Sequence, residues 1–364
     1  MSNPRIPVTL LTGFLGSGKT TVLRHLLRLP GLARTLVIIN ELGEVGLDHM
    51  LVSRVADDTV VAMRSGCLCC TVRGDLISTL KDAHWRFARG GERQFDRVII
   101  ETTGLADPAP IIHTLMTVEV LLQRYRLDGV VTTLDLTCGG RTLDAHWEAL
   151  KQAAVADCLL LTKADLADAA TIASMERRLS AINPAAPRIQ LRNGAVPPAA
   201  LLGLGQFDPV AKIPDVARWL DAEAYPGVGA RDPAPAGHAD HAHGQDAHRH
   251  DDQIRTFCVI IDPPLEDGLL DAWLDRLLSL CGPDMLRIKG ILSLRGRAAP
   301  VVIQGAQHLL YPLLELPAWP DDDRRSKIVF ITRGIPRESI EESLAAFIQV
   351  WQGPDTAPQR GPAP

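Results

Sequence analysis

The chain has 364 residues, of which 46% are hydrophobic and 22% are charged, and its 38 basic and 43 acidic residues give a formal net charge of −5. This is the composition of a globular protein with enough apolar residues for a sizeable core, and the length favours about two domains. The weak negative charge, without a long Lys/Arg run, argues against nucleic acid as a partner.

The apolar pattern and the cysteines indicate in which cellular compartment the protein is expected. Met1–Leu11 carries one basic residue and no signal-peptide core, and no apolar run reaches the ~18 residues that cross a bilayer. We therefore expect a soluble, cytoplasmic protein without membrane contact. The seven cysteines include three within four residues, Cys67–Cys70, unlike a secreted disulfide framework. In a reducing compartment this cluster indicates metal or redox chemistry.

Short apolar runs alternate with helical patterns through residues 1–220. The predicted strands are Val8–Thr12, Thr35–Ile39, Arg97–Glu101, Gly129–Leu134, Asp157–Thr162 and Arg188–Leu191. The predicted helices are Lys19–Leu29, Asp75–Ala88, Thr142–Ala154 and Ala169–Ile182. This alternation is typical of a mostly parallel sheet covered by helices, so we predict an α/β doubly wound domain over residues 1–220.

A second, smaller domain is predicted after a linker. Residues 221–253 are rich in Pro, Gly, Asp and His with little apolar content, which indicates a flexible linker. Residues 254–352 indicate a small α+β domain. Its predicted strands are Arg255–Asp262, Met285–Arg295, Val301–Gln304 and Lys327–Thr332, and its helices are Leu265–Cys281 and Arg337–Trp351. Residues 353–364 are expected to form a disordered tail.

Residues 13–20 match the phosphate-binding motif G-x-x-x-x-G-K-[ST], between a predicted strand and a predicted helix. Gly13, Gly16 and Gly18 allow backbone N–H groups to converge on phosphate oxygens, and the helix N-terminus adds its positive dipole end. Lys19 is expected to reach the β- and γ-phosphates, and the Thr20 hydroxyl to coordinate Mg²⁺. The predicted nucleotide-binding segment also includes Ser17 and Thr21. The alternative is a glycine-rich turn that only connects strand to helix.

The apolar run Val98-Ile99-Ile100 ends in Glu101-Thr102-Thr103-Gly104, as expected of a Walker-B-type strand. Glu101 would hold the Mg²⁺ sphere or orient the attacking water, and the Gly104 N–H would sense the γ-phosphate. Lys19, Glu101 and Gly104 are therefore the predicted catalytic residues. A buried strand that ends in a polar turn is the alternative.

A third motif, Thr162-Lys163-Ala164-Asp165, follows the apolar run Leu159-Leu160-Leu161. Asp165 can accept hydrogen bonds from guanine N1–H and from its N2 amine, which adenine does not offer, while the Lys163 stem lies along the base. GTP is thus favoured over ATP. Thr162 stands where the usual guanine motif has Asn, and a surface loop with an incidental ion pair is the alternative.

Cys67, Cys69 and Cys70 offer three soft ligands, whereas Zn²⁺ prefers four in tetrahedral geometry. One position would be missing or exchangeable, as suits a protein that passes metal onward. The candidates for it are Glu41, His49, a partner's residue, or the linker histidines His238, His241, His243, His248 and His250. Cu(I) and Co²⁺ remain open as metals. For the cysteines, the alternatives are a C-x-x-C redox pair or a core cysteine. For the histidine segment, the alternative is a soluble polar linker that binds no metal.

These segments together resemble the CobW family of P-loop GTPases, which includes zinc metallochaperones, cobalamin-synthesis proteins and nitrile hydratase activators. The matching segments, in order, are residues 13–21, Asn40-Glu41-Leu42-Gly43-Glu44-Val45-Gly46, Gly66-Cys67-Leu68-Cys69-Cys70-Thr71-Val72-Arg73, Glu101–Gly104 and Thr162–Asp165. The resemblance implies a slow, Mg²⁺-dependent GTPase. It also implies that its cysteines bind zinc or a related metal and release it to a client metalloprotein under control of the nucleotide. Apart from the resemblance, we expect a monomer or homodimer.

The resemblance further implies that Glu41 lies near the nucleotide or the metal. We expect the γ-phosphate and Mg²⁺ to order the segment from Asn40 to Arg73, because GTPase switches lie between the P-loop and the Walker-B strand. Two rivals stay open. One is a GTPase accessory protein for cobalt insertion or nitrile hydratase activation, and the other is a metal sensor that binds nucleotide without turnover.

Overall fold

The computed structural model describes residues 5–41, 60–64, 71–90, 92–197, 204 and 253–351. The chain divides into two compact units, one on each side of the predicted linker. Apart from Gln253, that linker lies outside the described residues, as does the predicted tail, so the proposed domain bounds stay a prediction.

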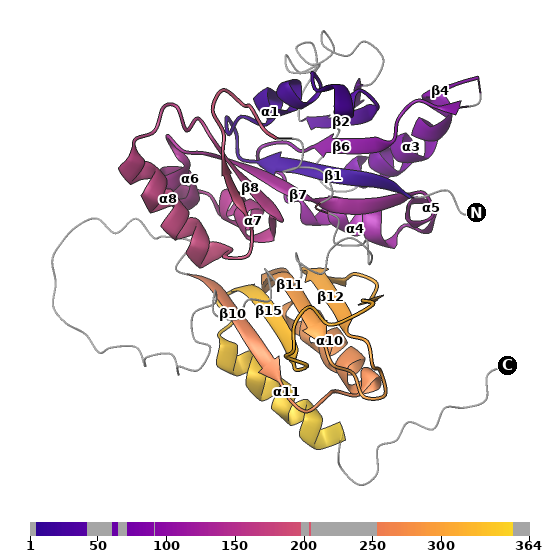
Figure 1. Ribbon diagram of the computed structural model, residues 1–364, viewed down its shortest axis with the longest axis vertical. Coiled ribbons are helices and arrows are strands. Elements are labelled where there is room, and N and C mark those ends of the chain that lie inside the picture. Colours follow the sequence, from indigo (N-terminus) through magenta and orange to yellow (C-terminus); the bar gives the residue numbers. More distant parts are fainter. Residues whose placement is uncertain are drawn as a thin grey trace. The chain divides into compact units, whose positions relative to one another are not determined.

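The N-terminal unit contains a seven-stranded sheet in the order β3-β2-β6-β1-β7-β8-β9, and every neighbouring pair is parallel (Figure 1). The predicted parallel α/β sheet is therefore confirmed. In sheet order the strands are Val60–Arg64, Thr35–Glu41, Arg97–Glu101, Ile6–Gly13, Tyr125–Asp135, Cys158–Thr162 and Arg188–Gln190.

Helices cover both faces of this sheet. Figure 1 shows α1 on one side, and α4 and α7 on the other. The core under α1 joins its Val22 and Leu23 to strand residues such as Leu11, which fits the alternation of side chains along a strand. The helices are α1 Lys19–Leu26, α3 Thr71–Arg86, α4 Ala109–Thr117, α5 Glu119–Leu122, α6 Gly139–Ala145, α7 Trp147–Val155 and α8 Ala169–Ile182, with a 3₁₀ turn at Pro30–Leu32 and a small hairpin of β4 Ala88–Arg89 and β5 Glu92–Arg93.

The helices of this unit differ from the sequence prediction in two places, and the strands β3, β4 and β5 were not predicted. The single helix predicted at Thr142–Ala154 is wrong, because the backbone of His146 is extended (φ −132°, ψ 112°) and separates α6 from α7. The helices α4 and α5 were not predicted, since Pro108 and Pro110 resemble loop punctuation. Proline is tolerated in the first turn of a helix, where its missing N–H would have no partner.

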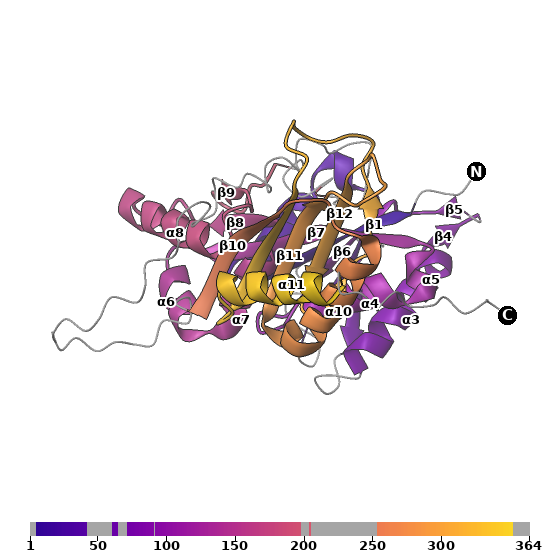
Figure 2. The ribbon, with the colours of Figure 1, turned by 90° about the horizontal axis from the view of Figure 1, so that it is seen from below.

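The C-terminal unit contains an antiparallel sheet in the order β10-β15-β11-β12-β13, with β14 also paired to β12. Figure 2 shows α10 and α11 on one face of it, which confirms the predicted α+β class. The strands are β10 Ile254–Ile261, β11 Met285–Leu292, β12 Val301–Ala306, β13 Leu309–Leu310, β14 Leu314–Glu315 and β15 Ser326–Arg333, and the helices are α10 Asp267–Cys281 and α11 Arg337–Trp351, with a 3₁₀ turn at Gly282–Asp284.

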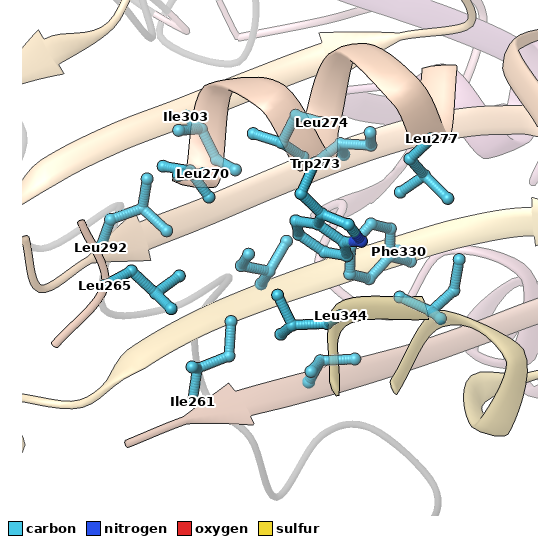
Figure 3. Packing of buried hydrophobic residues seen from close by; sticks show 14 of the residues in the cluster. Ile261, Leu265, Leu270, Trp273, Leu274, Leu277, Leu292, Ile303, Phe330 and Leu344 are labelled. Carbon is cyan, nitrogen blue, oxygen red and sulfur yellow. The ribbon is translucent and has the colours of Figure 1, made fainter. Parts of the chain in front are cut away.

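Trp273 of α10 is the largest fully buried side chain of this unit's core (Figure 3). Its ring meets that of Phe330 edge-on, with the centroids 6.5 Å apart, and its Nε1 donates a hydrogen bond to Ser343 Oγ of α11 at 3.1 Å. One side chain thus ties both helices to the sheet. Across the described part of the chain, no helix is both long enough and apolar enough to cross a bilayer.

Candidate nucleotide site

The P-loop connects β1 to α1 and requires glycine at two places. Gly18 caps the N-terminus of α1 with φ +93°, a left-handed conformation that glycine adopts without strain. At Gly13, where φ is +141°, an added Cβ would lie 2.2 Å from Thr133 Oγ1 of β7. The same hydroxyl lies 2.6 Å from Ser17 Oγ. The loop therefore lies directly on the neighbouring strand and leaves its other side open.

Lys19 begins α1, and its side chain folds over the loop. Its Nζ donates hydrogen bonds to the carbonyls of Gly13 at 2.8 Å and Phe14 at 3.1 Å. The side chain is largely buried and also lines the cavity described below. The loop's own carbonyls thus hold the ammonium where an anionic ligand would enter.

Thr20 and Glu101 meet because β1 and β6 pair in parallel, with Leu11 opposite Glu101. The hydroxyl of Thr20 donates to Glu101 Oε1 at 3.1 Å, and Glu101 is 5% exposed. A hydroxyl and a carboxylate side by side are the hard oxygen ligands that Mg²⁺ prefers, often one or two carboxylates beside substrate phosphates. The residues present therefore fit a Mg²⁺ ion.

Gly104 packs against the P-loop. A Cβ added to it would lie 2.5 Å from Leu15 N and 2.7 Å from Leu15 Cα, so only glycine allows this approach. The two loops enclose a cavity of about 480 Å³, within the usual range for small-molecule sites. It is lined by Leu15, Gly16, Gly18, Lys19, Thr20, Thr21, Arg24, Ile39, Glu101, Thr102, Thr103, Gly104, Leu105 and Lys163.

Thr162 connects the third motif to the first. Its buried hydroxyl is 2.7 Å from the carbonyl of Ser17 and 3.1 Å from that of Leu134, and can donate to either. A threonine therefore bonds to the P-loop backbone at the position where the usual motif has Asn. Asp165 is exposed, and its Oδ1 accepts a hydrogen bond from Asn193 N at 3.4 Å.

Lys163 has a left-handed backbone with φ +59°, which is uncommon outside glycine. Its Nζ lies 2.5 Å from Asp135 Oδ2 at the end of β7. Burial alone would raise the pKa of Asp135, but hydrogen bonds from Lys163, Thr137 and Cys138 outweigh it and hold that pKa below its ordinary value. Asp135 is therefore a charged anchor for the lysine at neutral pH.

The structure brings most of the predicted phosphate-site residues together. Lys19, Thr20, Glu101, Gly104 and Lys163 line one cavity, whereas Asp165 is not part of its lining. The predicted zinc ligands Cys67, Cys69, Cys70, His49, His238, His241, His243, His248 and His250 lie outside the described residues, as does the side chain of Glu41. Among the side chains that are described, no three His, Cys, Asp or Glu form a group able to hold a metal ion.

Sequence reasoning missed several cavity residues. Arg24 lies one helical turn after Thr20, so the i, i+4 rule places both on one face of α1 and could have identified it. Thr102 and Thr103 lie between the two predicted catalytic residues of the same motif. Ile39 ends the apolar run within β2 and carries no signal that separates it from a core residue.

A phosphate-binding loop between a parallel strand and a helix, with a carboxylate on the adjacent strand, defines a P-loop nucleotide-binding protein. Two family models match the chain: "CobW/HypB/UreG, nucleotide-binding domain" over residues 7–190, and "Cobalamin synthesis protein cobW C-terminal domain" over residues 254–348. The chain belongs to this CobW family of GTPases.

Curated relatives cover most of the chain. The zinc chaperone YjiA of Escherichia coli is 34% identical over 349 residues, 95% of this chain and 99% of its own length. The zinc chaperone CobW of a Sinorhizobium species is 31% identical over 82% of this chain and 85% of its own. The zinc-regulated GTPase metalloprotein activator 1 of Schizosaccharomyces pombe is 29% identical over 92% of this chain and 84% of its own.

A solved structure of the Zn(II)-bound YjiA GTPase from E. coli is similar to the whole chain. Its TM-score is 0.65 at 29% sequence identity, and the match covers 95% of this chain and 99% of that one. The likeness extends over both units, as the two family models do.

Proposed function

We propose that this protein hydrolyses GTP and uses the nucleotide cycle to load zinc, or a related transition metal, at Cys67, Cys69 and Cys70 and to deliver it to client metalloproteins. The observation that carries the proposal is the convergence of Lys19, Thr20 and Glu101 on one cavity, in a chain that carries three thiolates between its P-loop and Glu101. Relatives named zinc chaperones support the choice of metal.

The phosphates of the nucleotide would bind along residues 13–21, where backbone N–H groups, the start of α1 and Lys19 offer positive charge. The base would lie beside the stem of Lys163, whose Nζ is 2.5 Å from Asp135 Oδ2. Asp165 would select guanine by accepting from N1–H and the N2 amine. The link from Thr162 to Ser17 keeps these two ends of the site in register.

Hydrolysis would need charge neutralisation and an oriented water. Lys19 would exchange its bonds to the loop carbonyls for oxygens of the β- and γ-phosphates. Glu101 would position the water or its metal shell, and the Gly104 N–H would donate to the γ-phosphate. Thr20 and Glu101 would hold a Mg²⁺ ion, which would compensate the negative charge of the phosphates.

Zinc would be the cargo. Three thiolates leave one of its four preferred positions for Glu41, His49, a linker histidine or a group of the client. An incomplete ligand set lowers the barrier to transfer, since the client can add a ligand before the protein releases one. Because the thiolates lie in the sequence interval of GTPase switches, we expect the γ-phosphate to change their arrangement and thereby the zinc affinity.

The test is a zinc titration of the metal-free full chain under reducing conditions, with Mg²⁺ and either GDP or a non-hydrolysable GTP analogue. We expect tighter zinc binding with the analogue, and loss of that binding in Cys67→Ser. Equal zinc affinity with both nucleotides would refute the coupling, because a ligand without differential affinity shifts no equilibrium. Phosphate release from GTP at the rate of a protein-free control would refute the GTPase.

A further inference from the structure

Gln152 of α7 contacts the loop that follows β6. It is 1% exposed, and its Nε2 donates hydrogen bonds to the carbonyls of Gly104 at 3.1 Å and Ala106 at 3.0 Å. Since both partners are acceptors, only the NH₂ end of the amide can face the loop. The buried Oε1 accepts no hydrogen bond within the described structure. The side-chain amide therefore binds two backbone carbonyls of one loop through its NH₂ group.

Two further side chains, one in α7 and one at its N-cap, contact the loops around the nucleotide cavity. Lys151 Nζ lies 2.5 Å from Asp107 Oδ2, which adds an ion pair one residue beyond Ala106. At the N-terminus of α7, the His146 ring stacks on Phe14 of the P-loop with centroids 4.4 Å apart. The helix therefore contacts both loops that line the nucleotide cavity.

The other end of α7 is fixed to the fold. Asn183, the C-cap residue after α8, donates from its Nδ2 to the carbonyls of Ala153, Ala154 and Ala156 at 3.1, 3.1 and 2.9 Å. The Thr132 hydroxyl of β7 donates to the backbone carbonyl of Gln152 itself at 2.8 Å. These bonds hold α7 in place on the fold. The hydrogen bonds from Gln152 therefore fix the position of the loop after β6.

We propose that Gln152 is a positioning residue for GTP, which holds the Gly104–Ala106 backbone against the P-loop so that the Gly104 N–H meets the γ-phosphate. The inference rests on the proposed GTPase function. Gly104 packs so closely on the P-loop that an added Cβ would lie 2.5 Å from Leu15 N, and this contact is lost when the loop moves away from the P-loop. GDP has no γ-phosphate, hence release of the loop weakens the binding of GTP more than that of GDP.

Two variants separate this role from a packing role. Gln152→Met keeps the length of the side chain, removes both donors and also removes the unpaired Oε1, which limits the cost to folding. Gln152→Glu keeps the shape but directs carboxylate oxygens at two carbonyl oxygens, which repels the loop. Gln123→Met is the matched control, because Gln123 is exposed on the surface and its side-chain amide donates to Glu119 Oε1 one turn earlier.

The experiment uses the full chain with Mg²⁺ and measures melting temperature, phosphate release, and affinity for GDP and for a non-hydrolysable GTP analogue. Both Gln152 variants are expected to lose about 10- to 100-fold in phosphate release, as for a displaced catalytic group. The ratio of analogue affinity to GDP affinity should fall as well, with Gln152→Glu the more affected. Gln123→Met should match the wild type.

An unchanged affinity ratio and unchanged turnover in Gln152→Met would overturn the inference. So would an equal loss of GDP and analogue binding together with a lower melting temperature, which would indicate packing alone. If the wild type itself shows no turnover, the proposed function fails, and the affinity ratio still decides the role of Gln152.

Discussion

The hydroxyl of Thr162 lies 2.7 Å from the carbonyl of Ser17, so the motif expected to hold the base is bonded to the loop expected to hold the phosphates. Thr162 ends β8, and the P-loop follows β1, two strands away in the sheet. The bond fixes the distance between the two ends of the site in a way that pairing of adjacent strands alone does not.

Replacing Thr162 with Val keeps the shape of the side chain and removes its hydroxyl. The carbonyls of Ser17 and Leu134 then lose a buried donor, a change that typically costs about 1–3 kcal/mol, or roughly 5- to 150-fold in binding if it appears in full there. We expect weaker binding of both GDP and a GTP analogue, because the base and the P-loop serve both. Calorimetric titration would measure this, and a loss confined to the GTP analogue would contradict it.

Gly104→Ala should separate nucleotide turnover from folding. The new Cβ would lie 2.5 Å from Leu15 N, so the P-loop and the loop after β6 must move apart. We expect phosphate release from GTP to fall about 100-fold, the usual scale for a misplaced catalytic group. Gly140→Ala is the control, because a Cβ there meets no described atom within 4 Å apart from its chain neighbours and the backbone of its own helix. Wild-type turnover in Gly104→Ala would show that the close approach is not needed.

The sequence predicts the phosphate site well for a physical reason. Residues 13–20 are contiguous, and their own backbone forms the site, so a short motif carries nearly all of the information. Glu101 required one further step, the parallel pairing of its strand beside β1. The alternation of strands and helices predicted a parallel sheet, but it did not predict which strands are neighbours.

The contacts that hold the loops of the site against the rest of the fold could not be predicted. Gln152 bonds to backbone carbonyls, and a backbone carbonyl gives no residue-specific signal in the sequence.

The break between α6 and α7 could not be predicted either, because the helical pattern of the sequence continues through His146. There the chain is extended, and the His146 ring stacks on Phe14. A tertiary contact of this kind overrides local helix propensity, which is only a weak preference. The pattern therefore predicted one helix where the structure has two.

Cys158 and Cys258 should stay unreactive in the folded protein. Burial raises the pKa of the Cys158 thiol to about 12 and that of the Cys258 thiol to about 11. The thiolate is the reactive form, so raised pKa values leave both residues as thiols from about pH 7 to pH 9. Mass spectrometry after iodoacetamide treatment should find them unmodified without denaturant and modified with it. Cys281, which is partly exposed, is the internal comparison.

Native alkylation of Cys158 or Cys258 at the rate of Cys281 would contradict this expectation. If it holds, any zinc-dependent protection from alkylation comes from other cysteines.

Trp273→Ala should destabilise the C-terminal unit, and Trp273 is not among the residues that line the nucleotide cavity. The ring is fully buried against Phe330, and replacement of such a side chain by alanine typically costs about 3–5 kcal/mol. Hydrogen exchange should therefore become faster in β10, β11 and β15, while GTP turnover persists at temperatures where the protein is folded. Trp85→Ala, which removes a ring that is 72% exposed, is the control. Unchanged exchange in those strands would contradict the prediction.

Lys19→Ala tests whether turnover and metal binding are separable. The variant removes the ammonium that bonds to the carbonyls of Gly13 and Phe14 and that we expect to meet the phosphates. Loss of one charge-stabilising group typically lowers turnover about 100- to 1,000-fold, and we expect a decrease on this scale in phosphate release. Zinc binding by the nucleotide-free protein should be unchanged, because the thiolates supply the ligands. If zinc binding and turnover are lost together with a lower melting temperature, Lys19 supports the fold rather than the chemistry.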